Sequence, residues 1–451
     1  MSRPTQSARS AVWRLATARA ISITGGAAAF TALMFAVYER TGRSTMWLSA
    51  ALLVTFGVHG VLGWFAGALG DRFDRRKLLI VSDLAGAAVY LAMAPVAAAG
   101  LLLVFGFLAA VAESPFLPAS GASIPALVDR PEDVDRANSL VSVGTSVGIF
   151  LGPAIGGFLV DVVGPGTVFV ANAVTFTVSA ALIWSVRRPF AEQSDPAQQA
   201  EHRGVLAGLR YIRREPILAR ITVAFSIMVG FIGLVMVSDL PLVESFSTSE
   251  AQTGRLYGFL IAAWGLGSTL GALAGRVIHA RTDLRWLVGT SLGFALTMAA
   301  TGLSPVYWPV LVFLFANGFF DAMSIVAIRG IQQRRSPDAI RSRVMASTDA
   351  LLSLGVAVGY AAAGPLVAWL GPHVLYVAAG VGALMGTGLL VPLWRVRGTG
   401  ELALQGHADR FPDLVVDAMT EPRFTSAEEL ETETTPWRQA VAPRDGVGTT
   451  G

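Results

Sequence analysis

Three acidic residues of this sequence lie within or near the end of long apolar stretches, where charge is costly. Glu113, Asp321 and Asp239 each stand among mostly apolar neighbours. An ionised carboxylate at the centre of a bilayer costs about 2.5–3.5 kcal/mol on insertion scales, so such a group is expected to face a cavity. We therefore take all three as candidates for binding a proton or a cationic solute. The alternative for Glu113 and Asp321 is a structural role as a neutral acid hydrogen-bonded to a helix neighbour, and the alternative for Asp239 is a place in the membrane interface.

The composition around these acids indicates an integral membrane protein. Of the 451 residues, 53% are hydrophobic and 14% are charged, and the mean hydropathy is +0.58. A soluble domain carries about 25% charged residues. The net charge of +3 comes from basic residues in short loops, which does not suggest nucleic-acid binding. The chain has no cysteine, and its single lysine, Lys77, lies in no phosphate-binding loop, so we expect no enzyme, cofactor or metal site.

The apolar runs predict twelve transmembrane helices, since each run approaches the roughly 20 residues that a bilayer requires. The predicted fold class is therefore an all-α membrane protein. The spans are about 17–38, 47–70, 78–97, 101–127, 138–162, 167–186, 217–241, 254–277, 285–303, 308–331, 343–369 and 373–394.

The loops predict the domain order and the orientation. Basic residues concentrate in alternate loops, and the opposite loops hold only Arg40, Arg43 and Arg255, so the basic side is expected to be cytoplasmic. We expect five segments: a cytoplasmic N-terminal segment (1–16), a six-helix bundle (17–186), a cytoplasmic linker with an amphipathic helix (187–216), a second six-helix bundle (217–397) and a disordered cytoplasmic tail (398–451).

A charged loop between the second and third spans is a candidate gate. It contains Gly67, Asp71, Arg72, Arg75 and Arg76. Asp71 can accept hydrogen bonds from the exposed N–H groups of a helix N-terminus, where negative charge is favoured. The arginines can pair with nearby carboxylates, of which Asp83, Asp129 and Asp133 are the candidates. The alternative is that these charges only set the topology.

The fifth span contains a second motif, Gly148-Ile-Phe-Leu-Gly152-Pro153-Ala-Ile-Gly156-Gly157. Glycines four residues apart let helix backbones approach closely, and a proline inside a helix bends it. This pattern favours a tightly packed, bent helix that serves as a joint, against the alternative of a general packing face.

The two halves of the chain repeat these features. Arg136, Gly148, Gly152 and Gly157 recur 207 residues later as Arg343, Gly355, Gly359 and Gly364. The acid of the charged loop does not recur, because Gly275 stands where the second Asp71 would be.

The loop pattern Gly-x-Leu-x-Asp-Arg-x-x-Arg-Arg resembles the signature of the major facilitator superfamily, and the fifth-span motif is similar to that of its antiporter branches. The chain is most similar to drug/proton antiporters of the macrolide-efflux and enterobactin-exporter type. The resemblance implies two pseudo-symmetric six-helix bundles with alternating access, and an Asp71 that contacts the opposite half when the cavity faces outward. It also implies a multi-pass protein of the bacterial cytoplasmic (inner) membrane that acts as a monomer on small molecules, with protons as the coupling ion.

This comparison predicts export of a lipophilic or amphiphilic small molecule, a drug, macrolide or siderophore-like metabolite. Plausible cavity-lining residues are Phe116, Asn172, Trp264, Asn317 and Phe320. The alternatives are a nutrient importer or facilitator of the same fold, or a transport-inactive scaffold that handles lipid or acts as a receptor.

Overall fold

The structure is a computed structural model that describes residues 7–57, 73–190, 205–279, 282–337 and 340–395. Every regular element in these ranges is a helix. Eight of the described helices are long and apolar enough to cross a membrane, and one of them contains two predicted spans. The predicted all-α membrane class is therefore confirmed. Each of the twelve predicted spans contains described helical residues, the second only as far as Gly57.

The N-terminal half contains six labelled helices. They are α1 (Ala8–Arg40), α2 (Thr45–Leu52) with its continuation η1 (Leu53–Gly57), α4 (Arg75–Met93), α5 (Ala99–Glu113), α6 (Phe116–Leu127) and α7 (Val134–Trp184). Two local breaks matter for function. The fourth predicted span divides at Ser114-Pro115, so Glu113 ends α5. The fifth and sixth spans form one element that bends at Gly164, whose φ of 78° suits a residue without a side chain.

The C-terminal half repeats this plan after a short linker helix. Its elements are α9 (Val205–Arg214), α10 (Pro216–Glu244), α11 (Glu250–Ala274), α12 (Asp283–Gly302), α13 (Tyr307–Arg335), α14 (Arg341–Leu370) and α15 (Pro372–Leu390). Gly371 separates α14 from α15 with a φ of 80°, the same role that Gly164 has 207 residues earlier. The predicted internal repeat is therefore present in the backbone.

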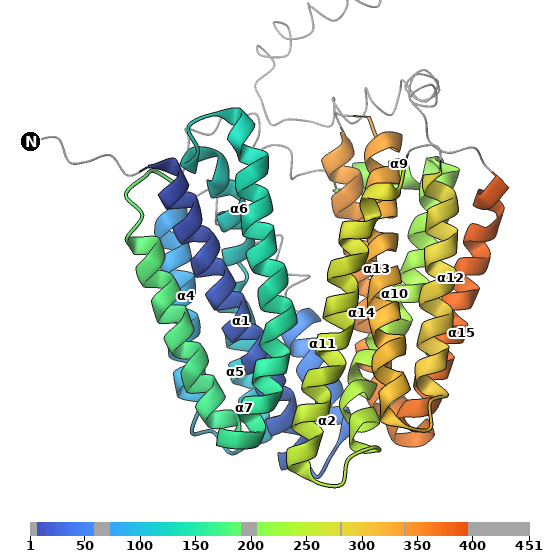
Figure 1. Cartoon of the computed structure of the whole chain (residues 1–451), viewed down its shortest axis with the longest axis horizontal. Coiled ribbons are helices and arrows are strands. Elements are labelled where there is room, and N and C mark those ends of the chain that lie inside the picture. Colours follow the sequence, from blue (N-terminus) through green and yellow to red (C-terminus); the bar gives the residue numbers. More distant parts are fainter. Residues whose placement is uncertain (1–6, 58–72, 191–204, 280–281, 338–339, 396–451) are drawn as a thin grey trace, which may run out of the picture.

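The helices form two bundles that lie side by side (Figure 1). They approach each other at the end that holds α2 and the nearby parts of α7 and α11, and they diverge at the end that carries α9. The start of α1 and the end of α15 lie at this second end. The contacts between the halves join α7 to α11 and α14 to α2.

The repeated glycines hold these helices together. Within the first half, Gly148, Gly152 and Gly156 face α1; a Cβ on Gly156 would lie 2.5 Å from the carbonyl oxygen of Ala28. Gly355 and Gly359 face α10 in the second half in the same way. Small residues at these positions permit backbone contact that any larger side chain would prevent.

Gly157 and its equivalent in the repeat, Gly364, each contact a helix of the other half. A Cβ on Gly157 would lie 2.5 Å from the carbonyl oxygen of Gly254 in α11. A Cβ on Gly364 would lie 2.8 Å from Ser49 Oγ in α2, and Thr45 Oγ1 donates to the Gly364 carbonyl at 2.7 Å. The interface between the halves is therefore symmetric. The fifth span, in α7, packs on the eighth, α11, and the eleventh span, α14, packs on the second, α2.

Candidate translocation site

A cavity of about 900 Å³ lies between the two halves and is lined by both of them. Its lining comes from α1, η1, α4, α5, α6 and α7 on one side and from α10, α11, α12, α13 and α15 on the other. Most of the lining is apolar or aromatic, and it includes four acidic residues, Asp83, Glu113, Asp239 and Asp321. A concave apolar site with a few converging polar groups is the usual form of a small-molecule site.

The two acids of the first half lie close to each other, near the middle of the bundle. Asp83 of α4 is 3% exposed and accepts a hydrogen bond from Ser22 Oγ at 3.4 Å, while its second oxygen has no hydrogen-bond partner among the described residues. Glu113 lies near enough to interact electrostatically with Asp83 and with Tyr90. One Glu113 oxygen is also buried without a hydrogen-bond partner. The break after α5 places this carboxylate at a helix end that faces the cavity.

The two acids of the second half lie on α10 and α13. Asp239 is 7% exposed, accepts a hydrogen bond from the hydroxyl of Tyr376, and lies near Tyr257 and Tyr360. Asp321 is partly buried and lines the cavity, with no hydrogen bond or ion pair to the part of the chain that the structure describes. All three acids singled out from the sequence therefore line one chamber.

The structure divides the predicted cavity residues into two groups. Phe116, Trp264 and Asn317 line the cavity, and the Asn317 amide donates to the Phe294 carbonyl at 3.0 Å. Phe320 does not line it. Its ring packs against Gly293 of α12, because one residue along a helix turns the side chain about 100° away from the neighbouring Asp321.

Asn172 also lies away from the central cavity. It is 1% exposed and lines a separate apolar groove of about 320 Å³ between α1 and α7, where Thr175 donates to its side-chain oxygen at 3.0 Å. The sequence placed it in an apolar span but could not show which neighbouring helix it faces.

The position of Asp83 also differs from the one expected from the sequence. The sequence suggests it as a partner for the loop arginines, because it follows Lys77 by only six residues. It instead lines the cavity from the third turn of α4. A periodic signal could have shown this, since Asp83 and Tyr90 are seven residues apart and therefore share one helix face. Tyr257 and Tyr376 are further cavity residues that sequence reasoning missed.

The candidate gating loop is described only in part. Gly67, Asp71 and Arg72 lie outside the described residues. Arg75 donates to the Ala122 carbonyl at 2.8 Å, and Arg76 donates to the Trp184 carbonyl. The expected pairing of these two arginines with carboxylates is therefore wrong: backbone carbonyls accept instead, one inside α6 and one at the end of α7.

The other candidate carboxylates of this region do not pair with them either. Asp129 pairs with Arg188. Asp74 caps α4 by accepting from the Lys77 amide at 2.9 Å. The described part of the loop is thus held by backbone hydrogen bonds and a helix cap.

The glycine motif of the fifth span packs against two different helices. Gly148, Gly152 and Gly156 pack on α1, whereas Gly157 packs on α11 of the other half. Pro153 lies between them and lines the cavity. The motif therefore borders the chamber and contributes to the contact between the halves.

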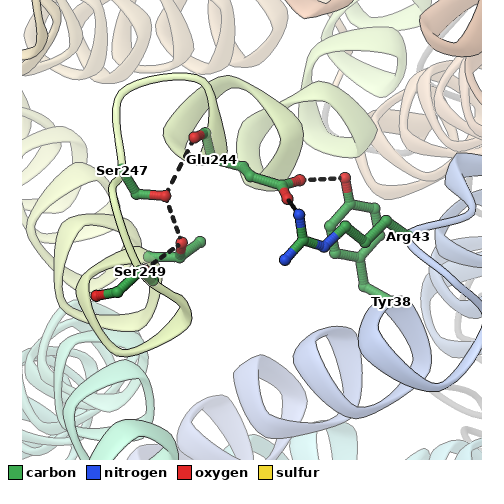
Figure 2. A network of polar contacts seen from close by, with 6 residues as sticks. Tyr38, Arg43, Glu244, Ser247 and Ser249 are labelled. Atoms are coloured by element: carbon green, nitrogen blue, oxygen red, sulfur yellow. Dashed lines mark hydrogen bonds and ion pairs between the residues drawn. The ribbon is translucent and has the colours of Figure 1, made fainter.

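Two ion pairs connect the halves at the end where they touch. Arg43 of the first half lies 2.5 Å from Glu244 of α10, and Arg255 of α11 lies 3.3 Å from Asp161 of α7. Figure 2 shows the Glu244 carboxylate facing both Arg43 and Tyr38, and the Tyr38 hydroxyl donates to it at 2.6 Å. Two of the three arginines found in the sparsely charged loops therefore bridge the halves. The third, Arg40, donates to the Val96 carbonyl within its own half.

Comparison with known proteins agrees with this architecture. The family model described as transmembrane secretion effector (MFS_3) matches residues 49–425. The enterobactin exporter EntS of Escherichia coli O139:H28 (strain E24377A / ETEC) is 28% identical over 369 residues, which cover 78% of this chain and 85% of the exporter. The enterobactin exporter EntS of Escherichia fergusonii matches with the same figures.

Solved structures show the same fold. A variant of the nucleoside transporter NupG superposes with a TM-score of 0.72 at 11% identity, covering 85% of this chain and 100% of that chain. A bacterial homologue of the human lysosomal transporter Spinster, in an inward-facing and occupied conformation, gives a TM-score of 0.69 at 15% identity over 90% and 99% of the two chains.

The fold and the central chamber define a multi-pass secondary transporter of the major facilitator superfamily. Within that superfamily, the chain belongs to the transmembrane secretion effector family.

Proposed function

We propose that this protein exports a lipophilic or amphiphilic small molecule across a bacterial cytoplasmic membrane in exchange for protons. The observation that carries the proposal is the cavity of about 900 Å³ between the halves, with its apolar lining and four carboxylates. The exporter relatives support the direction of transport. The protein acts as a monomer, and both of its termini lie in the cytoplasm, an orientation that the loop charges favour.

The proposed cycle is alternating access by rotation of the halves. Contacts between α7 and α11, and between α14 and α2, close the outer side, while the halves diverge at the end that carries α9 (Figure 1). A substrate enters from this inner side and binds in the cavity. The halves then close on the inner side, where the Asp71 loop contributes to closure, and the outer contacts separate.

Glu113 and Asp321 are the proposed proton sites, one in each half, and Asp239 is the third candidate. Protons that enter from the outer side neutralise the carboxylates and compete with the substrate, so that release outward accompanies proton uptake. A buried acid can serve in this way because its protonation changes the cost of burying it by several kcal/mol.

The experiment is dye export in everted membrane vesicles driven by a pH gradient. Glu113→Gln preserves the size of the side chain but cannot exchange a proton, so we expect export to lose its dependence on the gradient. Asp349→Asn is the control, because Asp349 is half-exposed and pairs with Arg329 outside the cavity. Intact, gradient-dependent export by Glu113→Gln would remove Glu113 as the coupling site, and accumulation only in right-side-out vesicles would show an importer.

A further inference from the structure

The charges that line the cavity have one sign. Among its described lining residues are four acids, Asp83, Glu113, Asp239 and Asp321, and no lysine, arginine or histidine. Arg19, one turn before the cavity residue Ser22 on α1, donates to Ser120 and does not line the chamber. We propose that the exported molecule is a lipophilic organic cation, which these carboxylates recognise. The inference rests on the proposed function insofar as this cavity is the transport site.

Buried acids elsewhere in the molecule are neutralised by an arginine. Glu215, 1% exposed, pairs with Arg335 at 2.8 Å, and Asp283, fully buried, pairs with Arg334 at 2.7 Å. This is the usual arrangement, because an unpaired buried charge is strongly destabilising.

In the part of the chain that the structure describes, no arginine pairs with the buried acids of the cavity. Asp83 has the Ser22 hydroxyl, and Asp239 has the Tyr376 hydroxyl. Within the described residues, one oxygen of Asp83 and one of Glu113 have no hydrogen-bond partner. The protein thus supplies an arginine where a buried acid is structural and omits it where the acid lines the chamber. A bound cation, or a proton, provides the missing positive charge.

The rest of the lining fits the apolar part of such a molecule. Aromatic rings reach the cavity from both halves, from Phe30, Phe56, Phe176, Tyr257, Trp264 and Phe294. The face of an aromatic ring attracts a cation by about 0.5–2 kcal/mol, more when water is excluded. An anion of the same size would meet the same rings and four carboxylates. The cavity therefore discriminates by charge rather than by size.

Two probes of nearly identical shape and opposite charge test this. Tetraphenylphosphonium and tetraphenylborate are titrated by calorimetry into the full chain in nanodiscs of neutral lipid, with empty nanodiscs as the blank. We expect the cation to bind at least about tenfold more tightly than the anion, equivalent to about 1.4 kcal/mol. Equal or tighter binding of the anion would overturn the proposal.

Substitution of single acids tests the source of the discrimination. Asp83→Asn and Asp239→Asn lie in different halves, so a folding defect in one leaves the other informative, and size-exclusion chromatography checks both. Each should weaken binding of the cation about tenfold, while Asp349→Asn leaves it unchanged. Unchanged cation binding in both cavity variants would mean that the acids serve protons only, and would overturn the proposal.

The outcome is separable from the proposed function. If the vesicles export a neutral lipophilic dye in response to the pH gradient but the protein does not bind the phosphonium ion, the cation proposal falls and proton-coupled export stands. If the phosphonium ion binds but no gradient-driven export occurs, recognition of a cation by the cavity stands and proton-coupled export is wrong.

Discussion

Single glycines decide how closely the two halves approach. Gly157 leaves no room for a side chain, since a Cβ there would lie 2.5 Å from the Gly254 carbonyl oxygen. The equivalent Gly364 of the second half is equally confined by Ser49 and by the backbone of Met46. Backbone atoms in such a contact cannot move aside as the end of a flexible side chain can. The conformational equilibrium is therefore sensitive to one methyl group at these positions.

We predict that Gly157→Ala destabilises the outer-closed state by about 1–3 kcal/mol, the usual cost of overpacking. Gly388→Ala is the matched control, because a Cβ there meets nothing within 4 Å. The measurement is the reaction of a single thiol, Ser49→Cys, with a membrane-impermeant reagent added on the outer side. A reaction rate equal to that of the control variant would contradict the prediction.

At the scale of elements, the linker helix α9 is part of the second half. Gly208 lies against the Arg343 carbonyl of α14, and the Tyr211 hydroxyl donates to the Arg335 carbonyl at 2.8 Å. Burial and the neighbouring Glu215 raise the pKa of Tyr211 to about 12, so this hydroxyl keeps its proton throughout the physiological range. The predicted amphipathic helix exists, and its buried face packs on protein.

The ion pair between Glu215 and Arg335 fastens this helix, and both side chains are less than 10% exposed. Glu215→Gln leaves a buried arginine without its counter-charge, which costs about 3–5 kcal/mol. We therefore predict a clearly lower midpoint of thermal unfolding in detergent. Asp349→Asn removes the exposed pair with Arg329 and should change the midpoint little, since such pairs contribute about 0–1 kcal/mol. Equal midpoints for the two variants would contradict this.

At the scale of the whole molecule, two arginines connect the halves at the end where these touch. Arg43 and Arg255 pair across the interface, whereas Arg40 bonds within its own half. The pairs are partly exposed, so each stabilises this contact between the halves by about 0.2–1 kcal/mol. Together they shift the conformational equilibrium toward the state in which the halves touch at this end, but they still allow the halves to separate, as a transport cycle requires.

Replacing both Arg43 and Arg255 by alanine should raise the outer labelling of Ser49→Cys by about two- to thirtyfold, from the loss of two pairs that together contribute about 0.4–2 kcal/mol. Arg40→Ala should leave the rate unchanged. Because the natural chain has no cysteine, the introduced thiol is the only one that can react. An increase with Arg40→Ala as large as with the double variant would show a general loosening of the loops instead.

Features that depend on local sequence could be predicted from it. The spans, the bend at Gly164, the separation of α12 from α13 and the repeat over 207 residues all follow from hydropathy and from glycine and proline positions. Helices in a bilayer satisfy their backbone hydrogen bonds internally, so local composition is enough to define them. The acids Glu113, Asp239 and Asp321 were found for the same reason, because a charge in an apolar run is visible in the sequence alone.

Only the tertiary structure decided which faces of these helices meet. It placed Asp83 in the chamber, turned Phe320 and Asn172 away from it, gave Arg75 and Arg76 carbonyl partners, and paired Arg43 with Glu244. Each of these contacts joins helices that are far apart in sequence or depends on the rotation of a helix about its axis. In a membrane, close packing of the helices sets that rotation, and every span is apolar around most of its circumference, so the sequence holds little record of it.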